Sequence, residues 1–297
     1  MTVADEERLE VRKTYKLFIG GKFPRTESGR SYLVTEGKGG KPLANACRAS
    51  RKDVRDAVVA ARAAFPTWAG MTAYNRGQIL YRIAEMLEGR REQFADEVSR
   101  SEGRSRKAAG AEVGKAIDRW VWYAGWADKL AQVFGSSNPV AGPYFNFSVP
   151  EPTGVVGVVA PPDSSLLGLV SRLAPVIAGG NTAVVLAAEQ RPLPAITLAE
   201  VLATSDLPSG VVNLLTGFTA ELIGPLAAHM DVNALDLAGL DLALFRDAEL
   251  AAAESVKRVV APVNLPAKAW LDDASGQDPY WIAAFLETKT VWHPIGG

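Results

Sequence analysis

The spacing of apolar residues predicts helices through much of the first half of the chain. Val54, Val58, Ala61 and Phe65 follow one another at intervals of three or four residues, which places them on one face of a helix. Similar spacing continues to about residue 133, and arginines within this stretch, such as Arg104, are interpreted as a solvated surface. This region is therefore expected to consist of amphipathic helices packed against a core.

Shorter patterns on either side of these helices predict strands. Residues 17–23 contain a Gly20-Gly21 turn and predict a β-hairpin, and residues 43–48 predict a further strand. In residues 144–149 apolar and polar side chains alternate, which indicates an amphipathic strand paired with a neighbour. Residues 288–292 are the last predicted strand.

From residue 154 onward, short apolar runs alternate with helical stretches. The run at 155–160 is apolar almost throughout, as expected for a strand buried on both faces of a sheet. The alternation predicts right-handed crossovers and a doubly wound parallel sheet, so the predicted fold class is α/β and Rossmann-like. The predicted strands and helices occupy residues 155–160, 166–177, 183–186, 193–203, 211–215, 219–229, 232–237, 247–255 and 256–260.

These patterns divide the chain into three parts. Residues 1–150 form an N-terminal helical region with several strands, residues 151–262 form the Rossmann-like domain, and residues 263–297 form a tail. The tail is shorter than the roughly 40 residues that a chain usually needs to fold alone, so we expect it to pack on other elements.

Composition and charge narrow the classes of function. The apolar content of 48% and charged content of 22% are typical of a soluble globular protein. A net charge of −1 without a basic patch argues against nucleic acid and membrane surfaces as partners. The polar start, the lack of a long apolar run and the single cysteine, Cys47, favour the reducing cytoplasm. No spacing of residues predicts a metal site.

Eight segments, in order and suitably spaced, give the chain a resemblance to the aldehyde dehydrogenase superfamily over roughly residues 15–260. The resemblance implies an α/β cofactor domain and a small oligomerisation hairpin built from early, middle and terminal strands. The segments are residues 17–23, 64–68, 75–80, 112–125, 152–161, 174–182, 189–190 and 207–213.

The resemblance also implies a chemistry whose residues can be checked. In active members a cysteine thiolate attacks an aldehyde, hydride passes to a nicotinamide cofactor, and a glutamate activates water. That nucleophile lies beyond the cofactor domain, in a catalytic domain that we expect to be largely absent here. Cys47 is interpreted as a small, partly buried structural thiol, so no catalytic residue is assigned.

Two further positions depart from the chemistry that the resemblance implies. Asp163 stands where the family has an asparagine that helps to hold an oxyanion, and we interpret it as the cap of the following helix. Pro262 follows the fifth strand, where the family has its general base, and proline cannot accept a proton.

The cofactor site that the resemblance implies is also degenerate. Leu186 replaces a lysine that contacts ribose, and Leu240 and Asp241 replace residues of a run that holds the pyrophosphate. We therefore expect no cofactor, with NAD or NADP as the open alternative. The vestigial contacts for such a cofactor would be Glu189, Gly217 and Gly239.

Three hypotheses about function follow. The first is a truncated pseudoenzyme, similar to the non-catalytic second domain of two-domain aldehyde dehydrogenases, that scaffolds or stabilises a full-length active aldehyde dehydrogenase or associates with itself. The second is an NAD(P)-dependent aldehyde oxidoreductase that uses the thiol of a partner. The third is a sensor that binds a small molecule or nucleotide in the crevice of the sheet.

Overall fold

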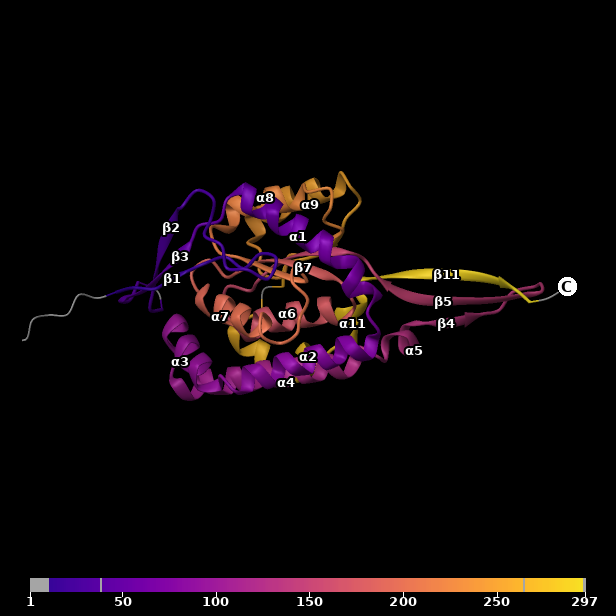
Figure 1. Ribbon diagram of the computed structural model, residues 1–297, viewed down its shortest axis with the longest axis horizontal. Coiled ribbons are helices and arrows are strands. Elements are labelled where there is room, and N and C mark those ends of the chain that lie inside the picture. Colours follow the sequence, from indigo (N-terminus) through magenta and orange to yellow (C-terminus); the bar gives the residue numbers. More distant parts are fainter. Residues whose placement is uncertain (1–10, 38, 264, 296–297) are drawn as a thin grey trace, which may run out of the picture.

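The computed structural model describes residues 11–37, 39–263 and 265–295, which form layers around a central parallel sheet (Figure 1). The sheet has five strands in the order β10-β9-β6-β7-β8, and all its pairings are parallel. The predicted Rossmann-like α/β class is therefore confirmed. The strands are β6 (Val155–Val159), β7 (Thr182–Leu186), β8 (Val212–Leu215), β9 (Ala234–Asp236) and β10 (Arg258–Val260).

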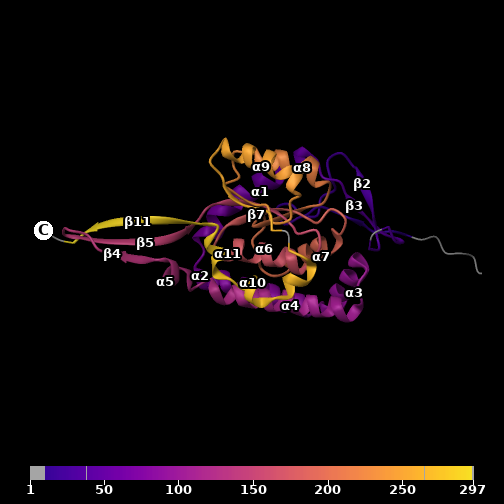
Figure 2. The ribbon, with the colours of Figure 1, turned by 180° about the vertical axis from the view of Figure 1, so that it is seen from behind.

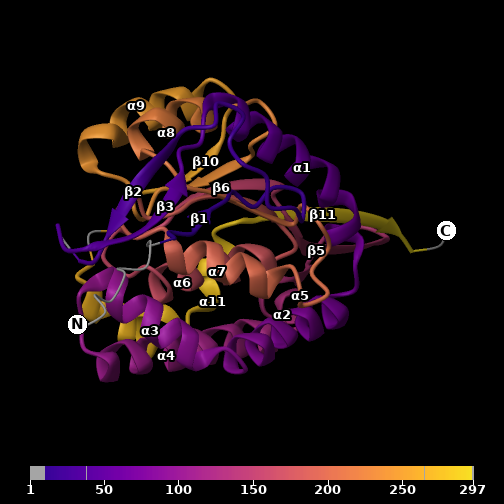
Figure 3. The same ribbon diagram turned by 60° about the vertical axis from the view of Figure 1, so that its left-hand side comes forward.

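Helices cover both faces of this sheet, as seen in Figure 3. One face carries α6 (Leu167–Ala178) and α7 (Leu193–Leu202), and the other carries α1 (Arg51–Gly70), α8 (Thr219–Ala227) and α9 (Leu242–Ala253). The start predicted for α9, residue 247, was wrong. The first turn is mostly exposed or half-buried and so lacks a clear apolar period, while Asp241 caps it.

The N-terminal helices form a further layer outside α6 and α7. They are α2 (Ala73–Glu88), α3 (Arg91–Glu102) and α4 (Arg106–Trp126), whereas the short α5 (Leu130–Phe134) packs against β5 (Tyr144–Pro152). Trp120 and Tyr123 of α4 are fully buried, in agreement with the expected packing against a core. The indole of Trp68, in α1, donates a hydrogen bond to the carbonyl of Ile177 at 3.0 Å and so connects α1 to α6.

A small sheet of three strands lies at one end of the body, on the left in Figure 1. Its order is β1-β3-β2, with β1 at Thr14–Tyr15, β2 at Ser31–Thr35 and β3 at Pro42–Cys47. The predicted hairpin at residues 17–23 is limited to a single bridge between Ile19 and Lys22. Phe18 instead pairs with Leu214 of β8, which joins this segment to the central sheet.

Three antiparallel strands, here called the arm, project from the other end of the body (Figures 1 and 2). They are β4 (Ser136–Asn138), β5 (Tyr144–Pro152) and β11 (Leu286–Pro294), in the order β11-β5-β4. The strands predicted at residues 144–149 and 288–292 are thus confirmed, and they pair with each other along nine registered positions.

The two faces of the arm differ in a way that alternation alone did not reveal. Asn146 and Ser148 are the buried members of β5, and their side chains share hydrogen bonds of 2.6 and 2.9 Å with the amide of Asn138. On the opposite face, the rings of Phe145 and Phe147 contact each other at 5.2 Å between centroids. Phe145 is 48% exposed, and the face that carries Asn146 also exposes two aromatic rings, those of Tyr144 (43%) and Trp292 (60%).

The tail packs on the body, as expected. Its helices η1 (Ala267–Leu271), α10 (Asp273–Gly276) and α11 (Pro279–Ala283) lie against α6 and α4. Arg119 of α4 is fully buried there and donates hydrogen bonds to the Ser171 hydroxyl at 2.6 Å and the Trp270 carbonyl at 3.3 Å. The division at residues 150/151 and 262/263 stays a prediction. Among the described helices, none is long and apolar enough to span a bilayer.

Candidate functional site

A cleft of about 660 Å³ lies where β6, β7, β9 and β10 end, the edge at which parallel α/β sheets bind ligands. It brings together six of the eight positions named from the sequence: Asp163, Glu189, Gly239, Leu240, Asp241 and Pro262. Leu186 lies outside the lining, buried at the end of β7, and Gly217 also lies outside it. The lining consists of residues 160–163, 188–191, 219–220, 238–242, 244, 262–263 and 265.

Asp163 does not cap α6, so that interpretation was wrong. The helix begins after Leu166, and the Gly168 backbone donates a hydrogen bond of 2.8 Å to the Ser164 hydroxyl, while the Asp163 carboxylate is 59% exposed. Its nearest cation is Arg191, 3.7 Å away. Arg191 also donates a hydrogen bond of 2.9 Å to the Pro162 carbonyl, so it holds this corner of the cleft together.

The start of α6 is stabilised instead by two buried glutamates that sequence reasoning missed. Glu102 accepts hydrogen bonds from the backbone and hydroxyl of Ser165, both at 2.8 Å. Glu112 accepts from the Ser164 hydroxyl at 2.9 Å and from the Leu167 backbone at 3.3 Å. Both carboxylates therefore lie at the positive end of the helix dipole.

Among the described residues, one cation forms ion pairs with both of these glutamates. Arg104 lies 2.9 Å from Glu102 and 2.6 Å from Glu112, so the interpretation of Arg104 as a solvated surface residue was wrong. Burial, and then the charge of Glu102, raises the pKa of the Glu112 carboxyl. The sequence offers one sign of this cluster, which is the presence of glutamates on otherwise apolar helix faces.

Glu189 stabilises the start of another helix. Its carboxylate accepts a hydrogen bond from the Thr219 backbone, the first residue of α8, at 3.1 Å. Its carbonyl accepts one from the Tyr32 hydroxyl at 3.0 Å. Gly217 lies just before this helix with φ of +151°, in close contact with the backbone of Ala49, so its role in the fold is a tight approach between two segments.

The turn between β9 and α9 is folded tightly on itself. A Cβ on Gly239 would collide with the backbone of Ala160, so only glycine fits there. Leu240 is 5% exposed and packs in the core beneath the cleft. The Asp241 carboxylate accepts a hydrogen bond of 2.9 Å from the Ala243 backbone and thereby caps α9.

These residues suit a dinucleotide poorly. Among the described residues that line the cleft, three carry carboxylates (Asp163, Glu189 and Asp241) and only Arg191 carries a positive charge. A pyrophosphate binds where backbone N–H groups and cations are free to receive it, and here like charges would repel it. Leu186 and Leu240 offer no hydrogen-bond donor in their side chains.

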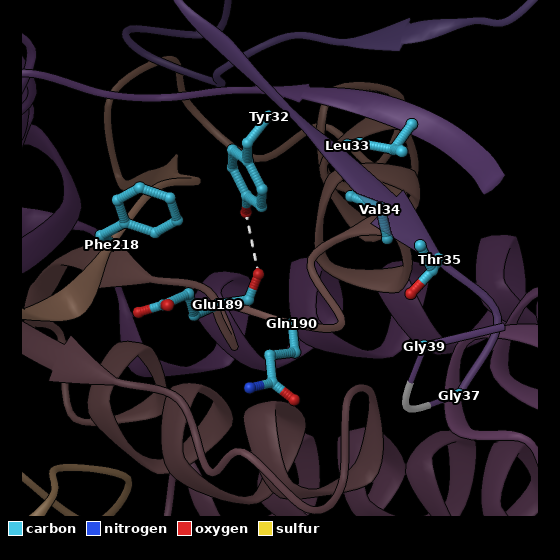
Figure 4. Close-up of a pocket in the computed structure, with 9 residues that line it drawn as sticks. All are labelled: Tyr32, Leu33, Val34, Thr35, Gly37, Gly39, Glu189, Gln190 and Phe218. Carbon is cyan, nitrogen blue, oxygen red and sulfur yellow. Dashed lines mark hydrogen bonds between the residues drawn. The ribbon is translucent and has the colours of Figure 1, made fainter.

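A second hollow, of about 560 Å³, adjoins the cleft (Figure 4). It lies between β2 and the loop after β7, and it shares Glu189 and Gln190 with the cleft. Tyr32 and Phe218 stand at one end, with ring centroids 5.4 Å apart. Burial, reinforced by the charge of Glu189, raises the pKa of the Tyr32 hydroxyl, so Tyr32 is neutral at ordinary pH.

Cys47 lies outside both cavities. It is buried at the end of β3, where its carbonyl accepts a hydrogen bond of 2.5 Å from the Thr216 hydroxyl. This placement agrees with a structural thiol. Across the described ranges, no group of three or more His, Cys, Asp or Glu side chains could hold a metal ion.

Comparison with known proteins gives the fold a family. The model of the aldehyde dehydrogenase family matches residues 24–264. The chain belongs to the aldehyde dehydrogenase family. This aldehyde dehydrogenase homologue is 34% identical to retinal dehydrogenase 2 of Gallus gallus over 235 residues, which are 78% of the chain and 45% of that relative.

Solved structures of the family superpose well on this aldehyde dehydrogenase homologue. HpcC from Thermus thermophilus gives a TM-score of 0.79 at 32% identity, with 83% of this chain and 47% of that chain covered. The NAD⁺ complex of an aldehyde dehydrogenase from Bacillus cereus gives 0.78 at 29% identity, with 83% and 50% covered. The chain thus spans about half the length of the relatives it matches.

Proposed function

We propose that this aldehyde dehydrogenase homologue is a non-catalytic subunit that binds an active, full-length aldehyde dehydrogenase through its arm and stabilises it. The exposed aromatic rings on the face of the arm that carries Phe145, here called the aromatic face, are the observation behind the proposal. Phe145, Phe147 and Val291 share this face, because Phe147 and Val291 are registered partners and Phe145 lies two residues from Phe147. Exposed aromatic patches on a projecting sheet are typical of surfaces that another chain covers.

The cleft supports the non-catalytic part of the proposal. The resemblance implies that Asp163 stands in place of the family's oxyanion amide and Pro262 in place of its general base. Both residues line the cleft. The Cys47 thiol is buried outside the cleft lining. The Bacillus cereus relative is an NAD⁺ complex, but we propose that this chain binds NAD or NADP weakly, since its cleft lining carries more negative than positive charge.

The test is co-expression with a full-length aldehyde dehydrogenase of the same organism, followed by mass measurement during size-exclusion chromatography. We expect a hetero-oligomer, and we expect the partner's activity to survive heating longer in the complex. The Phe145→Ser/Phe147→Ser variant should lose the complex. Tyr74→Ser removes a comparably exposed aromatic ring from α2 and should leave the complex intact.

Two outcomes would count against the proposal. The first is a chain that stays monomeric, or forms only a homodimer, when it is co-expressed with the aldehyde dehydrogenase. NADH production from an aldehyde by the isolated chain would contradict the non-catalytic role.

A further inference from the structure

A small cavity lies between α6 and the tail, away from the cleft and the arm. Its volume of about 10 Å³ gives room for one water molecule or one monatomic ion. Residues of α6, of the segment after β10 and of the tail helices line it together. A ligand in this cavity would therefore contact both the body and the tail.

Two residues that line the cavity carry buried N–H groups in need of an acceptor. The indole nitrogen of Trp270 is buried and donates to no acceptor among the described residues. The same holds for Nη2 of Arg172: the Asp236 carboxylate is 2.6 Å from this atom but accepts its hydrogen bond from Nε. Buried donors without acceptors cost free energy, so both groups favour a ligand that accepts hydrogen bonds.

The other side chains of the lining favour an anion over a water molecule. Val263, Leu265 and Ala269 line the cavity with apolar side chains, which accept no hydrogen bonds. A water molecule would accept from Trp270 and Arg172, but its own hydrogens would face these apolar groups. A halide ion only accepts hydrogen bonds, so it meets the demand of the two donors and adds none of its own.

The charge beside the cavity also favours an anion. Arg119 is fully buried and touches the cavity wall at Gly276, where a Cβ would collide with its guanidinium. Its ion-pair partner Asp273 lies 3.5 Å away, is 41% exposed and also pairs with Lys115. Two cations thus share one carboxylate, and burial lowers the pKa of the Arg119 guanidinium. An anion nearby would offset this buried positive charge.

We propose that the cavity binds one chloride ion, which accepts hydrogen bonds from the Trp270 indole and the Arg172 guanidinium. The ion lies between α6 and the tail, so its binding stabilises the packing of the tail on the body. This inference does not depend on what the arm binds or on whether the cleft holds a cofactor.

The test follows thermal unfolding of the whole chain while chloride replaces gluconate at constant ionic strength. Gluconate is too large for the cavity, whereas a ligand that binds only the folded chain raises the melting temperature with the logarithm of its concentration. We expect a rise of about 2 °C for each tenfold increase in chloride above the dissociation constant, given the unfolding entropy of a chain of this length.

A matched pair of variants tests the site itself. Trp270→Phe removes the N–H group and keeps an aromatic ring, so the dependence of the melting temperature on chloride should largely disappear. Trp126→Phe makes the same change on α4, outside the cavity lining, and should keep the dependence of the parent chain. Any general effect of chloride as a salt acts on both variants alike.

A crystal of the parent chain grown in bromide gives a second measurement, which decides the matter even if Trp270→Phe does not fold. We expect an anomalous peak within hydrogen-bond distance of the Trp270 indole nitrogen.

Three results would overturn the inference. They are a melting temperature of the parent chain that does not respond to chloride, equal responses of the two variants, and a crystal without bromide at this place. None of them bears on whether the arm binds an aldehyde dehydrogenase, because that association is read from mass.

Discussion

A buried ion pair between the central sheet and α6 allows a quantitative prediction about stability. Asp236 of β9 is fully buried, and one of its carboxylate oxygens lies 2.7 Å from Nε and 2.6 Å from a terminal nitrogen of Arg172. The other oxygen accepts a hydrogen bond of 3.1 Å from the Ala238 backbone. The guanidinium also stacks on the ring of Trp281, 4.0 Å from its centroid.

Asp236→Ala removes one partner and leaves the Arg172 guanidinium buried without a counterion. Breaking a buried pair in this way costs about 3–5 kcal/mol, a large fraction of the roughly 5–15 kcal/mol that stabilises a typical domain. The double variant Asp236→Ala/Arg172→Met removes both charges, and replacement of buried pairs by apolar side chains is often neutral. We therefore expect the double variant to recover most of the loss.

Urea unfolding followed by tryptophan fluorescence measures these differences in the free energy of unfolding. Glu151→Ala, which breaks the exposed pair with Lys289 on the arm, is the control and should cost less than about 1 kcal/mol. If Asp236→Ala costs no more than this control, or if the double variant loses the sum of the single losses, the reasoning about the buried pair fails.

Three further predictions concern single positions. Val256 is 92% exposed with φ of +54°, so Val256→Asn should raise the free energy of unfolding by about 1 kcal/mol; a lower melting temperature would contradict this. Burial raises the pKa of the Glu97 carboxyl above 4.5. The free energy of unfolding should therefore fall as pH rises from that value, because the unfolded chain then loses this proton more readily than the folded one. Glu97→Gln should make this fall smaller. Urea titrations of the two proteins at several pH values measure this difference. Curves of unfolding free energy against pH that run parallel would refute the prediction. Gly239→Ala should lower the melting temperature because its methyl group meets the Ala160 backbone, and an unchanged melting temperature would show that the turn can relax.

The order of strands and helices followed from the sequence because buried parallel strands such as residues 155–159 are nearly continuous apolar runs. Contacts between distant residues did not follow. Asp236 stands in a predicted apolar strand, and no local pattern links it to Arg172, which lies 64 residues earlier. The prediction that Asp163 caps α6 was wrong for the same reason, because it considered only residues close in sequence.

A side chain that caps a helix can be distant in sequence and close only in the folded structure. Asp241 caps the helix that follows it, but α6 receives its carboxylates from Glu102 and Glu112, which belong to the N-terminal helices. The resemblance was enough to predict which residues lie near the cleft, since they follow the ends of strands. It did not predict which carboxylates accept hydrogen bonds at the starts of the helices, and only the structure identifies them.

The pairing of β5 with β11 has a consequence for how the protein folds. All strands of the central sheet lie between these two strands in the chain, so the arm closes a loop over residues 153–285. Contacts of such long sequence separation form slowly, and on a ribosome β11 emerges only after the sheet. The aromatic face of the arm would therefore be completed last, so the association that we propose would begin only after the body has folded.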